Sequence, residues 1–180
     1  VVAGGNFFRR RDDCPRWLTR TSAGVAFLAL SPSARFGAVS WVYAGDLLQR
    51  QNYRTSVYDL ETGAELASIG GYAMDMSWVD DERIRYIKLD VRSVDVRQNE
   101  IREWNFVTGD DKLILLCPNC RGFAVSADGR YAFTVGFHLE GSVLEIRESI
   151  DAAPFVSISQ PGCYPRWWPD GRKVATAGLG

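Results

Sequence analysis

Two of the four cysteines stand in a C-x-x-C arrangement, Cys117-Pro-Asn-Cys120, and the other two are Cys14 and Cys163. A thioredoxin-like redox site needs this motif where a strand leads into a helix, and a four-cysteine zinc site needs a second close pair. Here the motif lies between two strand-like runs, and the other cysteines are far apart in sequence. The sequence therefore predicts no redox centre, no metal site and no cofactor.

The remaining polar residues give little support for hydrolytic chemistry. The sequence contains no G-x-S-x-G segment, and its single histidine, His138, stands where a strand-like run gives way to a turn. The acidic pairs, such as Asp110-Asp111, stand in expected turns, where adjacent carboxylates point in different directions and stay solvated. No G-x-G-x-x-G or P-loop pattern is present. We therefore expect that the chain is not an enzyme.

Composition excludes two further classes of protein. The 180 residues include 21 Lys and Arg against 22 Asp and Glu, for a net charge of −1. This balance creates no positive field for nucleic acid. The longest apolar run, Val25 to Leu30, is far below the roughly 18 residues of a transmembrane helix. We expect no nucleic-acid partner and no membrane insertion.

Apolar residues occur in runs of about five, rich in Val, Ile, Phe, Tyr and Trp, which is typical of short antiparallel strands. Four segments share a pattern of strand, tight turn and second strand. Asp128-Gly129 and Asp170-Gly171 are hairpin turns of this kind, because Gly adopts positive φ without steric cost. The repeats align at Ser31, Ser77, Ser126 and Trp168, with spacings of 46, 49 and 42 residues.

A second theme follows the first in each repeat. The segment Asp59-Leu-Glu-Thr-Gly63 matches Asn105-Phe-Val-Thr-Gly109, 46 residues later, and in both a strand reaches a polar turn that reverses the chain. The unit is thus four strands, and repeats of this length indicate a solenoid or a propeller. The expected boundaries are 24–70, 71–118, 119–161 and 162–180, and 1–23 can supply the outer strands of the last.

The motifs Ser-x-Asp-Gly-Arg, at Ser126 to Arg130, and Asp-x-x-Thr-Gly, at Asp59 to Gly63, resemble the blade repeats of bacterial TolB-like and WD40-like β-propellers. The resemblance implies an all-β chain, 1–180, forming a single β-propeller domain of about four four-stranded antiparallel blades. The sequence leaves two alternatives, a closed four-bladed ring and a segment of a larger propeller. In both, each blade would bury its two faces against neighbouring blades, as blades normally do.

Repetition also places the candidate site residues at the beginning of the inner strands, on one face. Arg, Trp and Tyr dominate binding hot spots, and those expected to contact a partner are Arg16, Trp17, Arg121, Tyr164, Arg166 and Trp167. The arginines would receive an acidic peptide, so reversing Arg121 and Arg166 should abolish capture without loss of stability. The alternative is that the tryptophans fill the wedges between blades.

The cysteines lie near the same face. Cys120 lies six residues before Ser126 and Cys163 five before Trp168, so both stand where an inner strand begins. A disulfide between Cys163 and either Cys117 or Cys120 is therefore one expectation. Reduced, buried cysteines in a cytosolic protein are the alternative.

The expected function is non-catalytic protein or peptide binding, or scaffolding. The alternative is an accessory, gating propeller of a larger enzyme, because such propellers resemble those of prolyl-oligopeptidase-like serine peptidases. The resemblance to TolB-like envelope proteins and the pairable cysteines favour an extracytoplasmic location, periplasmic or secreted, over a cytoplasmic one.

Overall fold

The computed structural model describes residues 2–3, 6–7, 23–43, 53–71, 73–89, 99–137, 141–160, 163–168 and 170–177. Every regular element in these ranges is a β-strand. None of them contains a helix that is long and apolar enough to cross a membrane. The expectation of an all-β chain is confirmed.

Three antiparallel four-stranded sheets form the body of the fold, each with its strands in sequence order. The first sheet contains β3 (Ala23–Leu30), β4 (Phe36–Tyr43), β5 (Tyr53–Asp59) and β6 (Glu65–Gly70). The second contains β7 (Ala73–Trp78), β8 (Arg83–Leu89), β9 (Asn99–Asn105) and β10 (Asp111–Leu116). The third contains β11 (Cys120–Val125), β12 (Tyr131–Phe137), β13 (Gly141–Arg147) and β14 (Val156–Gln160).

Two shorter sheets complete the described elements. β15 (Cys163–Trp167) pairs with β16 (Val174–Ala177), and β1 (Val2–Ala3) pairs with β2 (Asn6–Phe7). Among the described residues, no pairing joins these two sheets to each other. Most of the segment 1–23, expected to complete the last repeat, lies outside the described residues.

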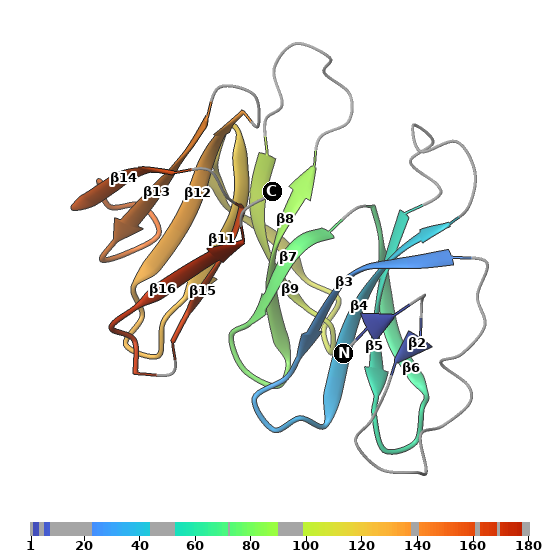
Figure 1. Cartoon of the computed structure of the whole chain (residues 1–180). Coiled ribbons are helices and arrows are strands. Elements are labelled where there is room, and N and C mark those ends of the chain that lie inside the picture. The colour runs from blue at the N-terminus through green and yellow to red at the C-terminus, as the bar shows by residue number, and fades with distance from the viewer. Residues whose placement is uncertain are drawn as a thin grey trace.

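The sheets stand side by side as blades, with their first strands innermost. β3, β7, β11 and β15 contact one another in the order β3 with β7, β7 with β11, and β11 with β15. In Figure 1, β14 and β6 lie at opposite edges of the molecule and β7 lies between them. Burial follows the same order, since the inner strand β7 is largely buried whereas the outer strands β6 and β10 are largely exposed. The predicted propeller-like architecture is confirmed.

Apolar side chains fill the spaces between neighbouring blades. Between the first two sheets, Trp104 and Tyr86 are buried with Met76, and Phe36 stacks on Trp78. The larger cluster between the second and third sheets is Met74, Ile87, Ile101, Cys117, Cys120, Phe123, Tyr131 and Phe133. At about 25 cal/mol per Å² of buried apolar surface, these wedges are the main source of stability, because each sheet has two apolar faces to cover.

The turns at Asp59 to Gly63 and at Asn105 to Gly109 are formed by the residues that the sequence indicates. The Asp59 Oδ1 atom accepts the N–H groups of Glu61 and Thr62 at 2.9 and 3.0 Å. Asn105 Oδ1 accepts those of Val107 and Thr108 at the same two distances. Gly63 and Gly109 then reverse the chain with φ of 79° and 83°. The second theme is therefore one local structure repeated in consecutive blades.

The alignment of the first theme needs one correction, in the second blade. A backbone hydrogen bond of 2.8 to 2.9 Å closes each inner hairpin, and its donors are Ser31, Val79, Ser126 and Trp168. Val79, not Ser77, is thus the equivalent position. Ser77 is instead a residue within β7 that pairs with Arg85 of β8, so its match to the other serines is a coincidence of residue type.

Candidate functional site

Each innermost strand is interrupted by a β-bulge near its start. The register shifts between Val25 and Phe27 in β3, and between Met74 and Ser77 in β7. Equivalent shifts fall between Cys120 and Gly122 in β11 and between Cys163 and Arg166 in β15. Bulges re-aim side chains and are common beside functional sites. Here they recur at one level of the fold, where the inner strands approach each other.

The residues four positions before the hairpin donors meet at this level, and we call them the inner-strand junction. They are Phe27, Asp75, Gly122 and Tyr164. The rings of Phe27 and Tyr164, from the first and last inner strands, have centroids 5.5 Å apart. A Cβ atom placed on Gly122 would lie 2.8 Å from Asp75 Oδ2 and 2.9 Å from Tyr164 Cα. Four repeat-equivalent residues thus converge on one point.

Asp75 is the charged member of the junction and is 0% exposed. Its Oδ2 accepts the Phe123 N–H at 2.7 Å. Its Oδ1 lies 2.5 Å from Arg166 Nη2, an ion pair that lacks the alignment of a hydrogen bond. Burial raises the pKa of Asp75, and the positive charge of Arg166 offsets part of that increase. Asp75 therefore joins three blades through β7, β11 and β15.

Arg166, one of the predicted binding residues, is committed to this junction. Its side chain is 55% exposed, but Nη2 contacts Asp75 and Nη1 donates to the Pro165 carbonyl at 2.8 Å. Reversing its charge would place a second carboxylate against the buried Asp75. We therefore expect charge reversal at Arg166 to lower stability, unlike the expectation from sequence, because the arginine neutralises a buried acid.

Trp167 and Arg121 also make structural contacts. The Trp167 Nε1–H donates to the Ala124 carbonyl at 3.2 Å, and its ring packs beside Leu144 under the Arg130 guanidinium. Trp167 thus fills a wedge, as the alternative interpretation has it. Arg121 Nε donates to the Gly136 carbonyl at 3.3 Å, within its own sheet.

The structure therefore brings Tyr164 and Arg166 together with Asp75. Arg16 and Trp17, the other predicted partner contacts, lie outside the described residues, as does His138. Sequence reasoning missed Asp75, although a carboxylate between Met74 and Met76 in an inner strand is an unusual arrangement.

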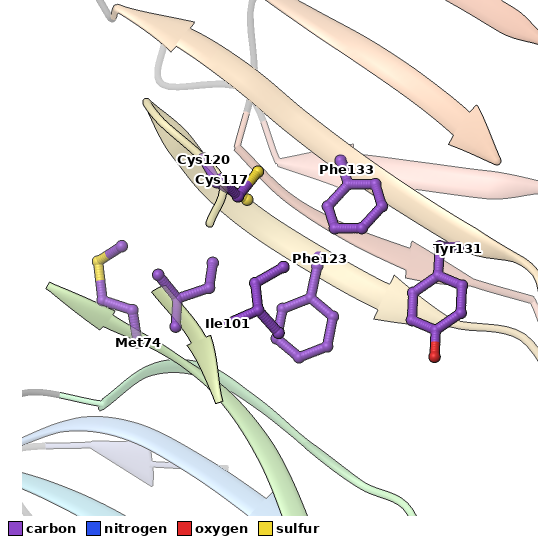
Figure 2. Close-up of a cluster of buried hydrophobic side chains, with 8 residues drawn as sticks. Met74, Ile101, Cys117, Cys120, Phe123, Tyr131 and Phe133 are labelled. Atoms are coloured by element: carbon purple, nitrogen blue, oxygen red, sulfur yellow. The ribbon is translucent and has the colours of Figure 1, made fainter. Parts of the chain in front are cut away.

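Cys117 and Cys120 are both free thiols and both buried. The structure thus contains no disulfide at either residue, and the Cys163 side chain is outside the described set. Cys117 directly follows β10, and Cys120 is the first residue of β11. In Figure 2 their sulfur atoms lie next to each other above the apolar side chains of Ile101 and Phe123. A hydrogen bond between the thiols lowers the pKa of Cys117 and, together with burial, raises that of Cys120.

A cleft of about 300 Å³ opens between the second and third sheets where β7 and β11 end. Residues 77–79 form one wall and residues 125–127 the other, and Arg85 from β8 also lines it. Arg85 Nε donates to Glu103 Oε2 at 2.8 Å, and its Nη1 donates to the Tyr131 hydroxyl. The alternation of Arg83, Ile84 and Arg85 places both arginines on one face of β8. That face lines a cleft because residues 125–127 of the neighbouring blade lie opposite it.

Glu103 is almost completely buried, yet three cations surround it. Arg85, Lys112 and Arg83 approach its carboxylate at 2.8, 3.3 and 3.5 Å. These ion pairs outweigh burial and hold the pKa of Glu103 below its usual range. Arg83 also pairs with Asp80. Arg85 is thus the charged residue among those that line the cleft, and it is held in place by Glu103. Within the described ranges, no three His, Cys, Asp or Glu side chains cluster as metal ligands.

Comparison with known proteins supports the architecture. No protein-family model and no curated protein sequence matches the chain. Among solved structures, a prolyl endopeptidase superposes with a TM-score of 0.56 at 14% identity, over 81% of this chain and 22% of that one. An acylaminoacyl peptidase from Pyrococcus horikoshii gives a TM-score of 0.53 at 14% identity, over 77% of this chain and 25% of that one.

The β-propeller domain of the Trilobed protease from Pyrococcus furiosus matches more loosely, with a TM-score of 0.49 at 18% identity, over 78% of this chain and 45% of that one. The chain spans about a quarter or less of the length of the two peptidases. At these identities the likeness concerns the fold alone. The more specific relation to TolB-like and WD40-like repeats stays a prediction, and the fold is propeller-like.

Proposed function

We propose that the chain is a non-catalytic propeller module that binds a peptide or protein segment in the cleft between its second and third sheets. The cleft itself carries this proposal. A volume of about 300 Å³ remains between the ends of β7 and β11, on either side of which the two blades face each other. That volume is at the lower end of the range for ligand pockets, and it suits one or two side chains of a bound segment.

The charges beside the cleft favour an acidic ligand group. Arg85 lines the cleft directly, and its planar guanidinium is suited to carboxylates. Two of its nitrogens are engaged by Glu103 and Tyr131, which fix the orientation of the side chain. Because the guanidinium of Arg85 lines the cleft, an acidic side chain or a C-terminal carboxylate is the expected contact.

Binding can be tested with short fluorescein-labelled peptides, in acidic and amidated versions, by fluorescence anisotropy. The variant Ala127→Trp fills the cleft from an exposed turn position and should abolish binding of the acidic peptides. Ala153→Trp makes the same change at an exposed position in the connection between β13 and β14, which does not line the cleft, and should bind like the wild type. Equal affinity of both variants for the same peptide contradicts the proposal.

A second candidate function is an accessory domain of a larger peptidase. The structural neighbours favour it, since a prolyl endopeptidase and an acylaminoacyl peptidase superpose with TM-scores above 0.5. Sequencing the gene beyond the codons of these 180 residues tests this candidate. An adjoining segment with a G-x-S-x-G elbow supports it. An adjoining segment without any nucleophile motif contradicts it, and leaves the binding module.

A further inference from the structure

We propose that Cys117 and Cys120 form a dithiol site that a small peroxide oxidises to an intramolecular disulfide. Such a site lies in the connection between the second and third blades. It differs from the expected pairing with Cys163, and it is independent of the cleft. The turn holds the two thiols close enough to form a bridge, and their different environments give them different roles.

The two cysteines are the first and last residues of a β-turn. The Cys120 N–H donates to the Cys117 carbonyl at 3.1 Å, and Pro118 and Asn119 are the central residues, Asn119 with φ of 59°. In such a turn the end Cα atoms lie within about 7 Å, and a disulfide accepts separations of roughly 4.4 to 6.8 Å. The adjacent sulfur atoms in Figure 2 agree with this. The bridge therefore forms with little backbone movement.

Asn99, at the start of β9, holds the turn from both ends. Its carbonyl accepts the Cys117 N–H at 2.8 Å, and its side-chain amide donates to the Cys120 carbonyl. Asn99 is itself buried, and its Oδ1 atom has no hydrogen-bond partner. A fixed turn keeps the two thiols together, so it favours an intramolecular bridge over reaction with a second molecule.

The two thiols are unequal in a way that suits sequential chemistry. The hydrogen bond between them lowers the pKa of Cys117, and the positive charge of Arg147 contributes in the same direction. The same bond and burial raise the pKa of Cys120. Because the thiolate is the reactive form, Cys117 is the nucleophile. Cys120, protonated and adjacent, is the resolving residue.

The reaction with hydrogen peroxide consists of two displacements. The Cys117 thiolate attacks one peroxide oxygen, the O–O bond breaks, and the departing hydroxide takes up a proton as water. Cys120 then gives up its proton and attacks the Cys117 sulfur, so the S–O bond breaks and the second oxygen leaves as water. Two thiols lose two electrons in total, and one peroxide is reduced to two waters. Only a small oxidant reaches the pair, since Cys117 is 5% exposed and Cys120 is 0% exposed.

The full chain permits a direct test, because trypsin separates the relevant cysteines. Cleavage after Lys112 and Arg121 places Cys117 and Cys120 in one peptide, 113–121, whereas Cys163 falls in 148–166. The reduced protein is exposed to hydrogen peroxide, denatured with N-ethylmaleimide present, digested and weighed by mass spectrometry. We expect peptide 113–121 to lose two hydrogens and to carry no maleimide, and dithiothreitol to reverse the change.

The variants separate the two roles. Cys120→Ser should lose the bridge and accumulate a sulfenic acid on Cys117 that dimedone traps, whereas Cys117→Ser should give neither product. Cys120→Ala repeats the first experiment if the serine disturbs folding at this buried position. A wild-type peptide 113–121 with two maleimides after peroxide overturns the proposal, and so does a cross-link between 113–121 and 148–166.

Discussion

The carboxylate of Asp75 occupies the space that a side chain at Gly122 would need. The two residues hold equivalent positions in consecutive repeats, and a Cβ atom on Gly122 would lie 2.8 Å from Asp75 Oδ2. The same carboxylate oxygen accepts the N–H of Phe123, the residue after that glycine. The approach of β7 to β11 at the inner-strand junction thus depends on a glycine in one blade and an acid in the other.

Gly122→Ala should lower the free energy of unfolding by about 1–3 kcal/mol, the usual cost of overpacking a filled interior. The new methyl group would also meet Pro165 Cδ at 2.8 Å and Tyr164 Cα at 2.9 Å, so backbone as well as side chain must move. Gly70→Ala is the matched control, since nothing lies within 4 Å of a Cβ atom there. Urea unfolding measures both. Equal stability of the two variants would contradict the close approach at Gly122.

The ionisation of Asp75 should make the protein less stable as pH rises. Because burial raises its pKa above the ordinary value of 3.8, the folded state binds the proton more tightly than the unfolded chain does. Stability from this group is present below the ordinary pKa and declines as pH rises through the folded pKa.

Asp75→Asn removes this titration while it keeps an oxygen for the Phe123 N–H. The stability of the wild type relative to Asp75→Asn should therefore fall as pH rises from about 4, the unfolded carboxyl value. Urea unfolding of both proteins over a pH series measures the difference. A difference that increases with pH would show that Arg166 dominates over burial.

Trp167 and Trp168 should differ sharply in their effect on stability. Trp167→Phe loses the hydrogen bond to the Ala124 carbonyl and part of the wedge between the third sheet and β15, so we expect a loss of about 1–3 kcal/mol. Trp168 is 55% exposed, and Trp168→Phe should change stability by no more than about 0.5 kcal/mol. Thermal unfolding followed by circular dichroism compares them. A larger loss of stability in Trp168→Phe would mean that Trp168, and not Trp167, fills the space between the third sheet and β15.

The local parts of the fold could be predicted from the sequence because their causes are local. Asp59 and Asn105 build the same turn with their own side-chain oxygens, and Gly129 and Gly171 have the positive φ that their hairpins require. The repeat of four strands follows from these turns and from the apolar runs between them. The structure confirms it in three complete sheets.

The residues at blade contacts could not be assigned in the same way. Asp75 gives no local signal of its partner, since Arg166 lies 91 residues later, in another sheet. Arg85 likewise lines a cleft only because residues 125–127 of the next blade lie opposite. Hot-spot residue types indicated binding at Trp167 and Arg166, but each of these side chains is engaged with a neighbouring blade. Residue type identifies groups that bind strongly, and only the packing shows whether their partner is internal.

Asp128 should have the opposite pH effect to Asp75. It pairs with Arg130 and accepts a hydrogen bond from Ser126, and these contacts lower its pKa from 3.8 to about 2. Here the unfolded chain binds the proton more tightly, so the contribution to stability is present above the ordinary pKa and is lost as pH falls through the folded value.

Asp128→Asn should accordingly be less stable than the wild type near neutral pH, and the difference should disappear as the pH approaches about 2. The group is on the surface of its hairpin, so added salt should reduce the difference at neutral pH. Urea unfolding of both proteins between acid and neutral pH, at low and high salt, measures this. A difference that stays constant across that range would mean that Asp128 acts through the shape of the turn and not through its charge.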